Sequence, residues 1–213
     1  MCPLCAGYRI AMRDLEIRGA GDVLGPQQSG HMSTVGYDMY VKLIEEAIGE
    51  AQGIEQTPEL DTRVELKLDA FLPESYVPQE KLRVEIYKRI AMIQDQDGRM
   101  DIEEELIDRF GDIPDPVINL MHIAQLRGVT RRLGISNLFL RPDGVHMRID
   151  PKFMPDPALL YEAVTRVDKR LRFTVSKTPE LVLAQPKMNA ESALETTIYV
   201  MTKVLEEIRK LKE

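Results

Sequence analysis

The sequence lacks both patterns that would direct a protein to a membrane. It has no run of about 18 apolar residues, the length needed to span a bilayer. It also lacks the N-terminal series of charged, apolar and small residues that forms a secretory signal. We therefore expect a cytoplasmic protein that makes no membrane contact. With 44% hydrophobic and 30% charged residues among 213, the chain can bury an ordinary globular core.

A block of basic residues is also missing. The formal net charge is -7 and the isoelectric point is about 5.2. Proteins that bind DNA over a wide surface neutralise phosphates with clustered Lys and Arg. The composition therefore disfavours a stand-alone nucleic-acid-binding domain, although it leaves room for small local contacts.

Residues that could hold a metal are few. The two cysteines, Cys2 and Cys5, form a CxxC pair that could be half of a zinc site or a redox pair. A tetrahedral zinc site needs two further ligands, and His31, His122 and His146 are scattered without ligand spacing. We expect no metal site, and we expect the histidines to be surface residues or hydrogen-bonded core residues.

Catalytic motifs are absent as well. The sequence has no phosphate-cradling Walker A loop, no paired acidic motif for Mg²⁺, no GxSxG elbow and no HExxH pair. No nucleophile and base can be assigned to one another. The chain by itself is predicted not to be an enzyme and to need no cofactor.

The elements that are present mix helices with short strands. Alternating apolar residues predict a strand over 63–69, and a Pro-Asp-Gly turn between 137–141 and 145–150 predicts a hairpin. Helical periodicity runs over 37–53, 81–93, 101–110 and from Ala190 onward. This pattern predicts the α+β class with a small, mainly antiparallel sheet. Further strands are expected over 171–176 and 181–184.

Two helices are predicted to begin with an Asp-Pro pair. Asp115 and Asp156 suit the N-cap, and the proline that follows each suits the first turn. The helix after Asp115 is apolar on more than one face, so we expect it to be central and to end near Gly134. We place a domain boundary in the polar segment 54–62, between an N-terminal part, 1–53, and a C-terminal domain, 63–213.

The segment from Arg13 to Gly30 is unusually rich in glycine, with glycines at 19, 21, 25 and 30. These would let the backbone approach another surface closely. The Gly-x-Gly pair at 19–21 fails as a dinucleotide-binding turn, because it follows charged residues rather than a buried strand. Arg18 can fork onto a phosphate or carboxylate, and Gln28 can both donate and accept hydrogen bonds.

This segment, RDLEIRGAGDVLGPQQSG, resembles the translocation motif shared by the transcription-repair coupling factors and the RecG branch-migration helicases. The residues that follow favour the first family. They resemble its helix after the motif and its C-terminal domain, at Gly36-Tyr37-Asp38-Met39-Tyr40, Tyr87-Lys88-Arg89-Ile90, Glu105 to Gly111 and Pro114-Asp115-Pro116. The resemblance covers nearly all of the chain from Gly7 onward.

The resemblance implies a larger parent protein, of which this chain would be an excised C-terminal piece. That parent would be an ATP-dependent DNA translocase that uses ATP and magnesium, displaces stalled RNA polymerase and recruits excision repair. Its implied partners are RNA polymerase, UvrA and double-stranded DNA. The alternative is an independent adaptor that binds repair proteins without any motor. ATPase motifs upstream of Tyr8 in the parent gene would separate the two.

Two candidate sites follow from the resemblance. Arg18 and Gln28 match positions that couple ATP hydrolysis to movement in the family, although Arg18 could instead make a local ion pair. Glu105, Asp108 and Arg109 fall within an arc of about 100° on one helix, turned away from its apolar stripe. The family's C-terminal domain is thought to hold its own N-terminal UvrA-binding module through this helix. The alternative for these three residues is an ordinary solvated helix face.

Overall fold

The computed structural model describes residues 60–213, and Leu60–Glu213 form one compact unit. The predictions for Cys2, Cys5, His31, Arg18, Gln28 and the helix over 37–53 lie outside the described residues. The domain limits of 1–53 and 63–213 therefore stay a prediction.

Within residues 60–213, a mixed five-stranded sheet carries helices on one face, so the predicted α+β class is confirmed. The strand order is β1-β2-β3-β5-β4. The pairs β2–β3, β3–β5 and β5–β4 are antiparallel, whereas β1 pairs with β2 in parallel. The strands are β1 (Arg63–Glu65), β2 (Ile135–Arg141), β3 (Gly144–Ile149), β4 (Leu171–Thr174) and β5 (Glu180–Ala184).

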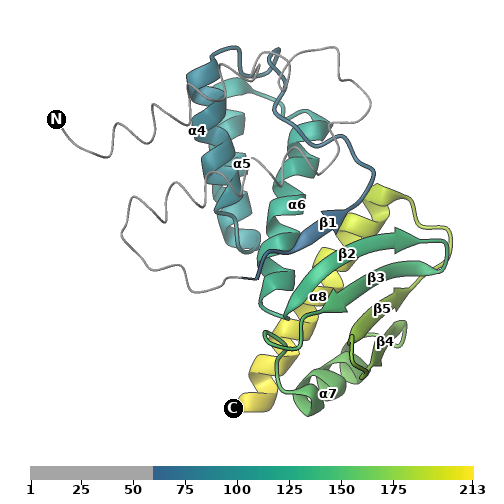
Figure 1. Cartoon of the computed structure of the whole chain (residues 1–213). Helices are drawn as coiled ribbons and strands as arrows, with labels where there is room; N and C mark the ends of the chain where they lie inside the picture. The colour runs from purple at the N-terminus through teal and green to yellow at the C-terminus, as the bar shows by residue number, and fades with distance from the viewer. Residues whose placement is uncertain (1–59) are drawn as a thin grey trace. The chain divides into compact units, whose positions relative to one another are not determined.

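The long C-terminal helix α8 runs behind the sheet in Figure 1, together with α7. Helix α6 contacts α8, the sheet and the pair formed by α4 and α5, so it connects the sheet to this helical end of the domain. This central position confirms the expectation drawn from its apolar faces. The helices are α4 (Glu80–Ala91), α5 (Gln96–Phe110), α6 (Asp115–Arg131), α7 (Pro157–Val167) and α8 (Ala190–Lys212).

The predicted first strand is shorter than expected. Burial alternates strictly from Leu60 to Leu72, but only residues 63–65 pair with β2. The rest of the segment follows α6: Asp61 binds Arg127 at 2.8 Å, and the carbonyl of Asp69 accepts a hydrogen bond from Asn119 at 3.1 Å. The alternation therefore reports an extended chain packed on a helix rather than a longer strand.

Local signals set several helix ends correctly. The carboxylate of Asp156 accepts hydrogen bonds from the N–H groups of residues 158 and 159, which confirms it as the N-cap of α7. Gly111 ends α5 with φ 80°. For α6 the predicted cap was wrong by one residue: Pro114 is the N-cap, and Asp115 lies in the first turn, where its charge suits the positive end of the helix.

The buried stripe of α8 is rotated slightly from the predicted one. Leu194, Met201 and Ile208 are buried as expected, but Ile198 and Leu205 are half-buried. Helix α8 packs against both α6 and α7. Its buried face is therefore wider than a single row of residues spaced four apart. The remaining buried positions are Ala193, Thr197, Val200 and Val204.

Candidate interaction surface on helices α4 and α5

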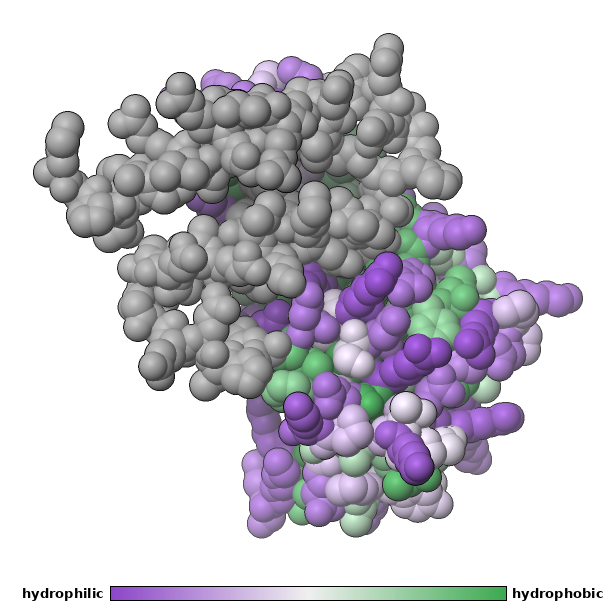
Figure 2. All heavy atoms as spheres, viewed as in Figure 1, coloured by the Kyte–Doolittle hydropathy of each residue, from purple (hydrophilic) through white to green (hydrophobic). Residues whose placement is uncertain are grey.

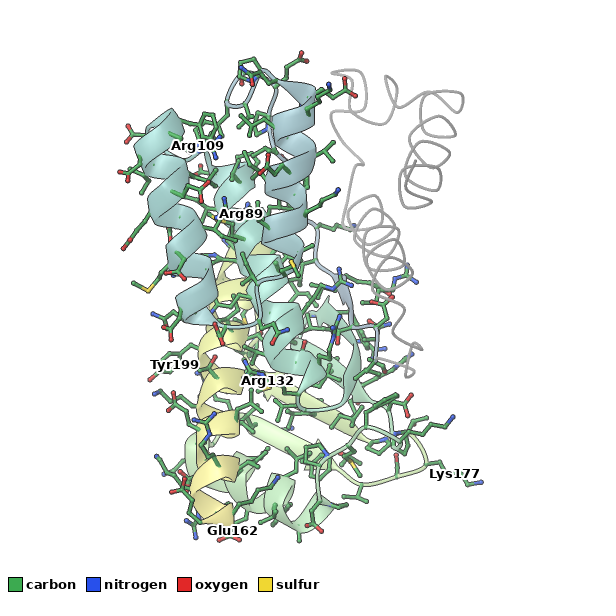
Figure 3. The ribbon with its side chains drawn as sticks, turned by 90° about the vertical axis from the view of Figure 1, so that its left-hand side faces the viewer. Arg89, Arg109, Arg132, Glu162, Lys177 and Tyr199 are labelled. Carbon is green, nitrogen blue, oxygen red and sulfur yellow. The ribbon has the colours of Figure 1, made fainter. Side chains whose placement is uncertain are left out.

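The three residues predicted to form a partner interface lie on α5, and the structure gives each of them a different environment. Glu105 lies between two arginines, Arg109 one turn further along α5 and Arg89 on α4. Asp108 is exposed and forms no ion pair with another residue of 60–213. The labels in Figure 3 mark Arg89 and Arg109 at the α4–α5 pair.

Arg89 binds Glu105 with both ends of its guanidinium group, one nitrogen to each carboxylate oxygen. Arg109 adds a hydrogen bond of 2.7 Å from its Nη1 to Oε1 of Glu105. The hydrogen bond from Arg89 is the largest cause that lowers the pKa of Glu105 to about 2, and the bond from Arg109 is the next. Glu105 therefore stays ionised throughout the neutral and mildly acidic range.

This ion-pair cluster joins two helices, but it lies near solvent. The side chains of Arg89, Glu105 and Arg109 are 40%, 30% and 41% exposed. Because water screens such pairs, we expect the cluster to stabilise the fold by only about 1 kcal/mol. Its clearer effect is geometric: it holds two guanidinium groups and one carboxylate at set positions on the surface.

An aromatic pair supports the same end of α5. The guanidinium carbon of Arg109 lies 5.2 Å from the centroid of the Phe110 ring, and that ring lies 5.6 Å from the ring of Tyr76. The hydroxyl of Tyr76 reaches two backbone carbonyls at the C-terminal end of the helix, those of Leu106 at 3.2 Å and Gly111 at 3.3 Å. The last turn of α5 is therefore fixed by tertiary contacts as well as by its glycine.

The sequence did not point to Arg89 as a member of this site. Arg89 belongs to the run Tyr87–Ile90 that resembles the family's C-terminal domain, and Tyr87 and Ile90 of that run are buried. One available signal was its position next to the buried stripe of α4, where a long basic side chain can reach a neighbouring helix. The identity of that neighbour depends on how α4 and α5 pack, which helical periodicity does not determine.

Neither histidine within the described residues lies at the α4–α5 surface. His146 is 7% exposed and lies between Asp143, at 3.1 Å, and Glu180, at 3.2 Å. His122 is half-buried, and burial is the main cause that lowers its pKa. Among residues 60–213, no three His, Cys, Asp or Glu side chains are grouped as a metal site would need. No helix in the same range has the length and apolarity to cross a membrane.

Comparison with known proteins identifies the family to which this domain belongs. Residues 66–160 match the model of the TRCF domain. The chain is 39% identical over 155 residues to the transcription-repair-coupling factor of Staphylococcus epidermidis strain RP62A, and 37% identical over 180 residues to that of Staphylococcus aureus strain USA300. These matches cover 72% and 81% of this chain. The chain belongs to the family of transcription-repair coupling factors.

The matched region is a small part of those relatives, 13% and 15% of their respective lengths. A solved structure, the crystal structure of the C-terminal domain of transcription-repair coupling factor, has the same fold. It aligns with a TM-score of 0.62 at 24% identity, covering 72% of this chain and 96% of that one. The chain is thus the C-terminal region of a transcription-repair coupling factor, as its motifs predicted.

Proposed function

We propose that this chain supplies two functions to a larger DNA translocase that displaces stalled RNA polymerase and recruits excision repair. Its segment 13–30 would couple ATP hydrolysis to movement, through Arg18 and Gln28. Its C-terminal domain would hold the N-terminal UvrA-binding module of the same protein in a closed resting state. Membership of the transcription-repair coupling factor family supports the proposal, and the whole-protein activities rest on that membership.

The contact that would close the resting state is the α5 polar face, which consists of Glu105, Asp108 and Arg109. The observation that supports this choice is the arrangement around Glu105. Two arginines share one carboxylate, so each guanidinium group keeps N–H donors for a second acceptor. Asp108 lies one turn from Glu105 and is free to accept from a partner. Such a surface suits a module that presents both acidic and basic groups.

The decisive experiment uses the intact parent protein with a triple substitution to Ala at Glu105, Asp108 and Arg109. We expect a more open protein with higher affinity for UvrA and a faster basal ATPase, because the closing contact is lost. A polar interface that couples by about 1–3 kcal/mol would change the closed population by roughly five- to 150-fold. A matched triple substitution to Ala at Glu195, Lys203 and Glu206 of α8 changes the charge by the same amount and should leave both activities unaltered.

A single substitution separates closure from stability. Asp108→Ala should change the free energy of unfolding by less than about 0.5 kcal/mol, since the side chain is exposed and unpaired within residues 60–213. It should still raise the affinity for UvrA if this face closes the resting state. If UvrA affinity and ATPase rate stay normal in both the single and the triple variant, the face is ordinary solvated surface.

A second candidate is the adaptor without a motor, which binds repair proteins through the same C-terminal domain. The curated relatives are several times longer than this chain, which favours the motor protein. A pull-down of this chain against the parent's N-terminal modules and against UvrA would separate the two. Binding to UvrA alone would favour the adaptor, and binding to the parent's own N-terminal module would favour closure.

A further inference from the structure

The face of the sheet opposite α7 and α8 carries no helix of residues 60–213 (Figure 1). In Figure 3 the helices lie on one side of the sheet, and Lys177, in the β4–β5 turn, extends away from them. The coloured part of the near view in Figure 2 is mostly hydrophilic, with small hydrophobic areas. Apolar strand residues such as Leu138, Met147 and Leu181 face the helices. The residues that alternate with them along each strand point to the other side of the sheet. We call this other side the open sheet face.

Strand register arranges the open sheet face in two rows that cross the five strands of residues 60–213, in the order β1, β2, β3, β5 and β4. Each row spans about 19 Å, because neighbouring strands lie about 4.8 Å apart. One row is Glu65, Phe139, His146, Val182 and Arg172, and the next is Arg63, Asn137, Arg148, Glu180 and Thr174. Arg63 and Glu65 form an ion pair of 3.2 Å with each other.

The centre of the open sheet face is a stack of rings and guanidinium groups. The rings of Phe139 and His146 are 5.6 Å apart and inclined by 17°. The guanidinium carbons of Arg141 and Arg148 lie 4.9 Å and 5.2 Å from the centroid of the Phe139 ring. Cation–π contacts of this kind hold a long side chain in place, so less entropy is lost when it binds a ligand.

The cations and anions of this face differ in their partners. Asp143 and Glu180 are both hydrogen-bonded to His146. The hydrogen bond between Asp143 and His146 is the main cause that lowers the pKa of Asp143. By contrast, the exposed residues Arg141, Arg148 and Arg172 form no ion pair with any residue of 60–213. The face therefore presents unpaired guanidinium groups, whereas two of its carboxylates are already engaged.

We propose that the open sheet face binds single-stranded nucleic acid, as a surface separate from the α5 polar face. Guanidinium groups can fork onto phosphate oxygens, and their planes can stack on unpaired bases. Sheet platforms with aromatic residues on central strands bind two or three bases of a single strand in this way. A duplex hides its base faces, so it would use only the charges.

The acidic composition of the whole chain sets the expected strength of this binding. A net charge of -7 opposes wide contact with a polyanion, so the contact is restricted to the three arginines. Each neutralised phosphate of a single strand contributes about -0.7 to the slope of log affinity against log salt. For about three phosphates, raising the salt from roughly 50 to 200 mM should weaken binding about 20-fold.

The test is fluorescence anisotropy of the full 213-residue chain with a labelled oligothymidylate of about 16 nucleotides, the upper end of single-strand site sizes for one small β-domain. The double variant Arg141→Gln with Arg148→Gln should bind at least about tenfold more weakly. The matched control, Arg209→Gln with Lys212→Gln at the end of α8, removes the same charge from exposed positions and should bind as the parent chain does. Far-ultraviolet circular dichroism checks that both variants are folded.

Two further arms make the result decisive. Phe139→Leu keeps an apolar side chain but removes the ring under both guanidinium groups, so it should weaken binding while the charge is unchanged. A duplex of the same length should bind more weakly than the single strand. The proposal is overturned if the chain does not bind the oligonucleotide at low salt, if both double variants lose affinity equally, or if poly-L-glutamate of equal charge competes as well as the single strand does. The last result would identify the surface as one for acidic protein segments.

Discussion

Gly128 of α6 and Gln94, in the turn between α4 and α5, are in direct backbone contact. A β-carbon on residue 128 would lie 2.4 Å from the Cα of Gln94 and 2.5 Å from its carbonyl oxygen. The same carbonyl accepts a hydrogen bond of 2.8 Å from Nη2 of Arg132. Because residue 128 has no side chain, the turn that leads into α5 can pack directly against α6.

Gly128→Ala should consequently lower the free energy of unfolding by about 2 kcal/mol or more, because a backbone segment would have to move. Gly98→Ala is the matched control. A β-carbon there meets only Oδ1 of Asp95, at 3.6 Å, and the helix gains up to about 1 kcal/mol from the loss of glycine flexibility. Chemical denaturation of both variants measures the difference. Equal stability of the two would contradict the close contact.

Glu105→Gln should lower stability by about 1 kcal/mol at pH 7, since one carboxylate charge between two arginines is lost. The pKa of Glu105 is depressed from 4.5 to about 2, so its ionised form stabilises the fold above pH 4.5. That stabilisation declines as the pH falls from 4.5 toward 2. The denaturation midpoints of the parent chain and the variant should therefore converge over this range. Glu104→Gln, at an exposed position of the same helix, is the control and should unfold at pH 7 as the parent chain does.

Tyr76→Phe should lower stability by about 1 kcal/mol, because the hydroxyl contacts two carbonyls at the end of α5 while the ring contact with Phe110 is kept. In a domain of this size the melting temperature should fall by about 3 °C. The control is Tyr199→Phe on α8, whose side chain is 65% exposed. A thermal melt followed by circular dichroism compares the two, and equal melting temperatures would show that the Tyr76 hydroxyl contributes nothing.

In the proposed parent translocase, Arg18→Ala or Gln28→Ala should uncouple hydrolysis from movement. We expect ATP turnover to persist while polymerase displacement or triplex disruption fails, because these side chains offer polar contacts rather than nucleotide ligands. Parallel loss of both activities would indicate misfolding or a catalytic role. Normal displacement would mean that Arg18 makes a local ion pair.

The isolated chain should neither bind nor hydrolyse ATP, since its sequence has no phosphate-cradling loop and no acidic pair for magnesium. Equilibrium dialysis with labelled ATP and a phosphate-release assay measure both activities. Saturable binding with magnesium-dependent turnover would contradict the prediction.

Sequence patterns predicted those features of the fold that depend on interactions between residues close together in the chain. The carboxylate of Asp156 acts within a few residues, and Gly111 directly follows the periodic pattern over 101–110, so the start of α7 and the end of α5 could be predicted. The prediction for Asp115 was off by one position, because Asp in the first turn satisfies the helix charge as well as Asp at the cap does. The half-buried state of Ile198 could not be predicted, since it depends on where α6 and α7 lie against α8.

The residues of the candidate site also divide into those that local spacing could predict and one that depends on helix packing. Helical spacing alone placed Glu105, Asp108 and Arg109 on one arc of α5, because 3.6 residues per turn is a property of the backbone. The partner of Glu105 on α4, Arg89, comes from 16 positions earlier in the chain and is brought close only by the packing of two helices.

The sequence by itself determined the α+β class, the hairpin around Pro142-Asp143-Gly144 and which strand residues are apolar, because turn chemistry and the period of two act between neighbours along the chain. Only the tertiary structure decided that β1 pairs in parallel with β2, that β3 pairs with β5 rather than with β4, and that one face of the sheet carries no helix from residues 60–213. Those relationships depend on strand order and on how the layers pack, which arise from contacts between segments far apart in the chain. Residue alternation within one strand does not specify which other strand lies beside it.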